Sequence, residues 1–119
     1  MLLTQEQETP LFDPENASYA SIMYAIAFDM NTAAMEVAYP NDSWRNGYKE
    51  IEEILGRHGF IPQQRSVYYG DKNVDQVACA LAVQDLANRL SWFADSVDDI
   101  RMLQLLPNDD LKRVLTTES

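Results

Sequence analysis

The stretch Ser21-Ile-Met-Tyr-Ala-Ile-Ala-Phe-Asp29 decides the fold that this sequence predicts. It is a short apolar run rich in β-forming residues, and the polar pair Asn31-Thr32 follows it, so it predicts a strand buried on both faces rather than a helix. A carboxylate on the last residue of such a strand is held at the rim of the sheet, where it can reach a ligand. Asp29 is therefore the first candidate functional residue, and the competing interpretation is a helix cap or turn residue.

Two helical patterns follow this strand. The first is an apolar stripe at spacings of four, three and four residues, formed by Trp44, Tyr48, Ile51 and Leu55. It predicts a helix whose N-terminus is capped by residues 41–43 and which ends at Gly59. The second opens at Asp71 and runs to about Leu90. Between them, Phe60-Ile61 and 66–69 predict two short strands joined as a hairpin.

Shorter patterns complete the chain. A helical turn or two is expected over 31–37, and a short helix capped by Ser91 over 92–97. Residues 98–106 predict the last strand, and Asn108 can start a terminal helix over 111–115. The order strand, helix, two-stranded hairpin, helix, strand predicts an α+β, ferredoxin-like β-α-β-β-α-β fold, an antiparallel sheet with helices on one face.

This topology brings distant residues together at one rim of the sheet. The first and third strands are central and antiparallel, so the end of the first lies beside the start of the third. Asp29 is therefore expected to face Arg65 and Ser66, with the amide of Gln64 nearby. A carboxylate, a hydroxyl, a guanidinium and an amide form the predicted constellation.

Composition and charge limit the class of protein. The 119 residues suit a single domain with 46% hydrophobic and 24% charged residues, and the net charge of −10 argues against a free-standing basic nucleic-acid binder. The single cysteine, Cys79, excludes an internal disulfide and a multi-cysteine zinc site, and its apolar surroundings predict a small core residue. No apolar run approaches membrane-spanning length, so a cytoplasmic protein without a membrane contact is expected. Residues 1–22 lack periodicity and are expected to form an N-terminal extension before a domain over 23–119.

Three separated segments together resemble the virulence-associated protein D (VapD) family. They are Met23-Tyr-Ala-Ile-Ala-Phe-Asp29, Gln64-Arg-Ser-Val-Tyr68 and Trp92-Phe-Ala-Asp-Ser-Val-Asp-Asp-Ile-Arg101. That family is similar in turn to the small CRISPR-associated adaptation subunit with nuclease ancestry. The resemblance runs from Met23 to about Leu106 and says nothing about the first 22 residues.

The resemblance implies a ferredoxin-like homodimer with endoribonuclease activity, often a toxin paired with an antitoxin protein. It places catalysis on the Asp that ends the first strand, here Asp29, with Ser66 and Gln64 at the polar positions that open the third strand. Arg65 is a candidate to neutralise phosphate or to pair with Asp29. Tyr68 and Tyr69 are candidates for stacking bases on the sheet, although strand tyrosines also serve as core or dimer contacts.

Two chemical routes to RNA cleavage stay open on the sequence. Two copies of Asp29 near a two-fold axis can share a divalent cation, Mg2+ or Mn2+. A metal-free route needs a side-chain base, but the single histidine, His58, stands at a helix end where a structural role is favoured. Arg45, Lys49 and Arg65 are the clustered bases available for a short RNA contact despite the acidic chain.

Two other classes of function compete with RNA cleavage. One is a catalytically inactive ferredoxin-like dimer that acts as a protein-interaction or assembly subunit, because a fold alone does not imply activity. The other is a small acidic regulatory domain that acts through its N-terminal arm. RNA preference and the identity of a partner are not encoded in any pattern of this chain.

Overall fold

The computed structural model describes residues 22–106 and 111–116. The elements in chain order are β1 (Met23–Met30), α1 (Thr32–Ala38), η2 (Trp44–Asn46), α2 (Gly47–Arg57), β2 (Phe60–Gln64), β3 (Val67–Gly70), α3 (Gln76–Arg89), α4 (Phe93–Ser96), β4 (Val97–Leu105) and η3 (Leu111–Thr116). The expected N-terminal extension and the helix start at Asn108 lie outside the described residues. Within the described part of the chain, no helix is both long and apolar enough to cross a bilayer.

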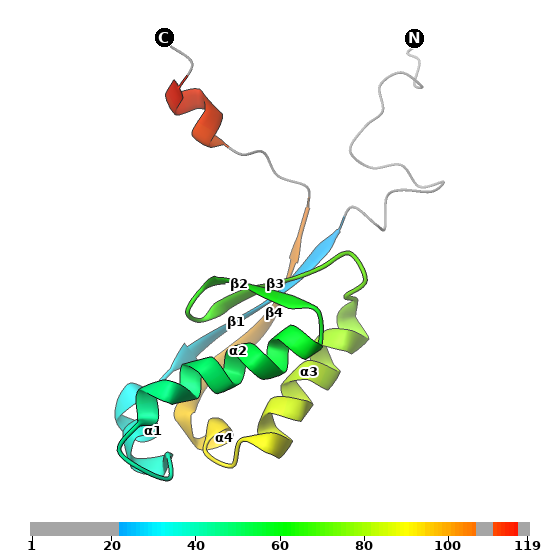
Figure 1. Cartoon of the computed structure of the whole chain (residues 1–119). Coiled ribbons are helices and arrows are strands. Elements are labelled where there is room, and N and C mark those ends of the chain that lie inside the picture. Colours follow the sequence, from blue (N-terminus) through cyan, green and yellow to red (C-terminus); the bar gives the residue numbers. More distant parts are fainter. Residues whose placement is uncertain (1–21, 107–110, 117–119) are drawn as a thin grey trace, which may run out of the picture.

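The four strands form one sheet in the order β2-β3-β1-β4, and each neighbouring pair is antiparallel. Helices α2 and α3 lie across one face of this sheet (Figure 1). Strand order, antiparallel pairing and the placement of the helices confirm the predicted ferredoxin-like α+β fold. The two central strands are β1 and β3, as that topology requires.

The core lies between the sheet and the helices, and β1 shows why. Successive side chains of a strand point to opposite faces, so Ile26 and Phe28 face the helices, where both are buried. The ring of Phe28 stacks 6.0 Å from Tyr68 and meets Phe93 edge-on at 6.1 Å. Helix α2 contributes its predicted apolar stripe to the same cluster, chiefly through Ile51.

The starts of the helices differ from the predicted ones. The 3-10 turn η2 precedes α2, and no side-chain cap bond forms at Ser43. Helix α3 begins at Gln76, five residues after the predicted opening at Asp71, because Asp75 caps it by accepting a hydrogen bond from the amide of Ala78 at 2.8 Å. Asp71 instead closes a turn by accepting from the amide of Asn73. The predicted end of α2 is confirmed, since Gly59 has a φ of 88°.

The face of the sheet away from the helices carries an apolar row. Cα partners across the four strands are Ile61, Tyr69, Ala25 and Leu103 in sheet order. The outer two residues stay exposed, Ile61 at 57% and Leu103 at 39%. Ala25 between them is fully buried and Tyr69 is half-buried, while helices α2 and α3 lie on the opposite face of the sheet (Figure 1).

Candidate active site at the end of β1

Asp29 lies at the end of β1 with an exposed side chain on the face away from the helices, since its neighbour Phe28 points into the core. Its Cα partner on β4 is Asp99. Side chains of directly paired residues on adjacent strands share one face and lie close together, so two carboxylates stand side by side at this rim. The side chain of Asp99 accepts a hydrogen bond from Arg101 Nε at 2.8 Å, which partly offsets the repulsion.

Ser66 contacts the end of β1 through its backbone. The amide of Phe28 donates to the Ser66 carbonyl at 3.0 Å, which extends the β1–β3 pairing by one residue beyond Ala27 and Val67. The start of β3 therefore lies beside the end of β1, as the sequence predicted. The side chain of Ser66 is half-buried.

The side chains predicted to lie together at the rim are in fact on different sides of the sheet. The Arg65 guanidinium stacks on the ring of Tyr48 in α2, 4.5 Å from its centroid, on the side of the sheet that the helices cover. Asp29 points to the other side. No ion pair between Arg65 and Asp29 is present among the described residues.

Arg65, Gln64 and Tyr68 line one cleft, of about 690 Å3, between α2 and the β2–β3 hairpin. The complete lining is Arg45, Tyr48, Lys49, Glu52, Glu53, Gly56, Pro62, Gln63, Gln64, Arg65 and Tyr68. The structure therefore brings the three predicted substrate-binding residues together, along with the predicted bases Arg45 and Lys49. Asp29 is not part of this lining.

Tyr68 forms the floor of the cleft rather than a surface on the open sheet. Its side chain is 2% exposed and faces the helices, whereas Tyr69 faces the opposite side. Burial, together with the negative charge of Glu52, raises the pKa of Tyr68 to about 12. The hydroxyl therefore stays protonated at neutral pH.

Sequence reasoning missed Tyr48 and Asp99. Tyr48 was assigned to the apolar stripe of the helix, where it does pack against the core, and its half-buried ring also lies under Arg65. The signal for Asp99 was present as the Asp98-Asp99 pair, but which of these carboxylates stands beside Asp29 depends on the register between β1 and β4. That register is a property of the sheet.

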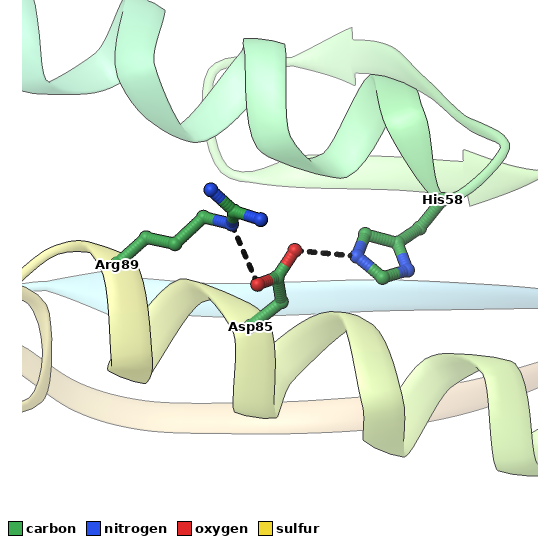
Figure 2. Close-up of polar contacts among 3 residues, drawn as sticks. All are labelled: His58, Asp85 and Arg89. Carbon is green, nitrogen blue, oxygen red and sulfur yellow. Dashed lines mark hydrogen bonds and ion pairs between the residues drawn. The ribbon is translucent and has the colours of Figure 1, made fainter.

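His58 serves a structural role at the end of α2. Its Nε2 contacts the Oδ2 atom of Asp85 in α3 at 2.8 Å, while Arg89 donates from Nε to the Oδ1 atom at 2.7 Å (Figure 2). The hydrogen bonds from His58 and then Arg89 hold the pKa of Asp85 below its ordinary 3.8. The cluster lies at the end of the sheet where β1 begins, away from Asp29.

Cys79 lies inside α3 and is buried. Cys79 is 3% exposed, as predicted for a core residue, and burial followed by the charge of Asp75 raises the pKa of its thiol. Among residues 22–106 and 111–116, no group of three or more histidine, cysteine, aspartate or glutamate side chains is arranged to hold a metal ion. Asp29 and Asp99 offer two carboxylates.

Known proteins similar to this chain carry one name. No protein-family model matches the chain. It is 39% identical over 89 residues to endoribonuclease VapD 2 of Riemerella anatipestifer, covering 75% of this chain and 95% of that protein. It is 40% identical over 89 residues to an endoribonuclease VapD homolog of Helicobacter pylori, in a match that covers 75% of this chain and 92% of that protein. It is 34% identical over 83 residues to endoribonuclease VapD of Dichelobacter nodosus, in a match that covers 70% of this chain and 86% of that protein. With its ferredoxin-like sheet and an exposed aspartate at the end of β1, the chain belongs to the VapD endoribonuclease family.

Proposed function

We propose that this protein is an endoribonuclease of the VapD type that cleaves RNA with the carboxylate of Asp29. The observation that carries the activity is the 39% identity to an endoribonuclease VapD over 95% of that protein's length. The structure supports the choice of Asp29 because its side chain is exposed on a rigid strand end.

Asp29 is proposed to accept the proton of the oxygen that attacks the phosphate, or to bind a cation that activates that oxygen. RNA cleavage needs an activated attacking oxygen, a stabilised leaving oxygen and neutralisation of the charge that develops on phosphorus. Ser66 is proposed to contact the same phosphate, because its backbone is bonded to the residue before Asp29. Gln64, Arg65 and Tyr68 are proposed to hold the adjoining part of the substrate in the cleft that they line.

A divalent cation, Mg2+ or Mn2+, fits the donors at this rim. Carboxylate oxygens are the ligands that hard cations prefer, and Mg2+ is often held by one or two carboxylates together with water and substrate phosphate. Asp29 supplies one carboxylate, and the second comes from Asp99 of the same chain or from Asp29 of a second copy. When bound, the cation supplies Lewis acidity toward the phosphate.

The cellular setting follows from the same family membership. We propose that the protein acts in the cytoplasm as the toxin of a toxin–antitoxin pair, and that an antitoxin protein holds it inactive.

One observation favours a second function. The apolar row on the sheet face opposite α2 and α3 suits a protein partner, which is what an inactive ferredoxin-like assembly subunit would need. The two functions differ in what Asp29 contributes, because an assembly subunit does not depend on a carboxylate at the strand end.

The test compares RNA cleavage by the purified chain with that of Asp29→Asn. We expect cleavage to fall by about two orders of magnitude or more, the usual scale for losing a general base or metal ligand. The free energy of unfolding should change by less than about 1 kcal/mol, because the amide is nearly isosteric and relieves repulsion with Asp99.

Three companion measurements sharpen the test. Ser66→Ala should cost less cleavage than Asp29→Asn, because the hydrogen bond that the structure shows for Ser66 uses its backbone carbonyl. Asp99→Asn distinguishes the two sources of the second carboxylate. Cleavage should fall in this variant if Asp99 of the same chain binds the cation, and should not change if Asp29 of a second copy does. Chelator with added Mg2+ or Mn2+ tests the cation. Unchanged cleavage by well-folded Asp29→Asn protein would remove Asp29 from the chemistry.

A further inference from the structure

The cleft between α2 and the β2–β3 hairpin has a net positive lining on an acidic protein, because three basic side chains outnumber its two acidic ones, Glu52 and Glu53. Three of the nine basic residues of the chain line it, namely Arg45, Lys49 and Arg65, although the net charge is −10. All three side chains are exposed. None of them takes part in an ion pair among the described residues, whereas Arg89 and Arg101 each hold an aspartate.

The two arginines of the cleft are supported by aromatic rings. The Arg65 guanidinium lies over Tyr48 at 4.5 Å and the Arg45 guanidinium lies over Trp44 at 4.4 Å. A guanidinium over an aromatic ring keeps its charge and N–H donors available for phosphate, and its planar group can also stack with a base. The arrangement fits a ligand that has both phosphates and bases.

The β2–β3 turn connects the cleft to the rim at the end of β1, although the Asp29 side chain lies on the other side of the sheet. Gln64 and Arg65 line the cleft, and the next residue, Ser66, is bonded through its carbonyl to the amide of Phe28, directly before Asp29. A strand of nucleotides that leaves the cleft over this turn therefore arrives at the end of β1.

We infer that this cleft is a subsite for single-stranded RNA, in which Arg45 and Lys49 bind backbone phosphates and the stacked Arg65 carries a base, so that the chain crosses the β2–β3 turn to reach Asp29. The inference rests on the proposed ribonuclease function. A single strand is the ligand proposed, because its unstacked bases are free to stack on an exposed guanidinium, whereas the bases of a duplex are already stacked and paired.

The test measures binding of a fluorescein-labelled single-stranded RNA twelve-mer by anisotropy in the Asp29→Asn background, with intact RNA checked on a gel. The cleft variant is Arg45→Gln with Lys49→Gln. The matched control is Arg57→Gln with Lys72→Gln, which removes the same two positive charges at exposed positions that do not line the cleft. Both pairs are also made with Asp29 intact, to measure cleavage.

We expect the cleft variant to bind at least about tenfold more weakly, with the slope of log K against log salt reduced by about 1 to 1.5, since each phosphate contact on a single strand contributes about 0.7. The control should change affinity less than about threefold. Arg65→Lys keeps the charge but loses the planar group, and we expect several-fold weaker binding. A duplex of the same sequence should bind more weakly and respond equally to both pairs.

Equal losses in the cleft and control pairs would overturn the subsite, as would a duplex that binds as tightly as the single strand. The two proposals fail separately. If Asp29→Asn abolishes cleavage while the cleft variant binds like the control, the cleft is not the subsite and the proposed function stands. If Asp29→Asn still cleaves while the cleft variant loses binding, the catalytic assignment fails and the subsite stands.

Discussion

Two glycines of α2 have opposite surroundings. A Cβ atom on Gly47 would lie 2.5 Å from Cε of Met35 and 2.8 Å from Cη2 of Trp92. The methionine end can move, but the Trp92 ring is 3% exposed and packs against Tyr39. A Cβ on Gly56 would meet no heavy atom within 4 Å. Gly47 is thus required by packing, and Gly56 is not.

We expect Gly47→Ala to lower the free energy of unfolding by about 1–3 kcal/mol, because overpacking forces buried side chains from their positions. Gly56→Ala should raise it by about 0.5–1 kcal/mol, because alanine loses less backbone entropy in a helix and nothing obstructs it. Urea unfolding of both variants measures the two changes. Effects of the same sign would contradict this account of how α2 approaches the core.

Helices α2 and α3 are joined at one end by the cluster of His58, Asp85 and Arg89 (Figure 2). The Asp85 carboxylate serves both neighbours, one on each helix, and they lower its pKa from 3.8. A group with a lowered pKa in the folded state contributes stability above its unfolded pKa, and this contribution is lost as the pH falls through the folded pKa. The link between the helices is therefore strongest from mildly acidic pH upward.

We expect Asp85→Asn to be less stable than the parent chain at pH 7, with a difference that narrows as the pH falls below about 4 and the parent carboxylate is protonated. Midpoints of urea unfolding at pH 7 and pH 3 measure the effect. The control is Asp75→Asn, which changes an exposed helix-cap carboxylate that has no basic partner among the described residues. A difference that is the same at both pH values would show that Asp85 acts through packing alone.

At the scale of the molecule, the sheet separates two surfaces. One is covered by α2 and α3 and carries the basic cleft; the other carries the apolar row and, at the end of β1, the two aspartates. An apolar face with exposed side chains on a small protein is usually a contact surface. A second copy that packs there would also bring two rims near a two-fold axis, which is the dimer proposed for the shared cation site.

We expect sedimentation at micromolar concentration to return twice the chain mass of 13.6 kDa. Leu103→Lys should give a monomer, because it places a charge in the apolar row. Gln104→Lys is the matched control, since the next residue along β4 points to the opposite face. A monomeric parent chain would remove both the dimer and the cation site that needs it, and would leave Asp99 as the second carboxylate.

The sequence alone determined the elements and their order. Apolar periodicity is local, so β1, the stripe of α2 and β4 were predicted close to their observed bounds, and the ferredoxin-like order placed Ser66 beside the end of β1. Helix starts were less well determined, because Asp71 and Asp75 are both suitable caps and only the folded chain assigns the turn to one and the helix to the other.

Only the tertiary structure decided where the side chains of the site point. The register between β1 and β4 sets Asp99 beside Asp29, and packing of α2 on the hairpin draws Arg65 onto Tyr48 and away from the rim. Both depend on contacts between segments far apart in the chain, and residue spacing does not encode them. Sequence thus predicted candidate residues for the chemistry, whereas the pairing of strands and the packing of helices divided these candidates between a carboxylate rim and a cleft with a net positive lining.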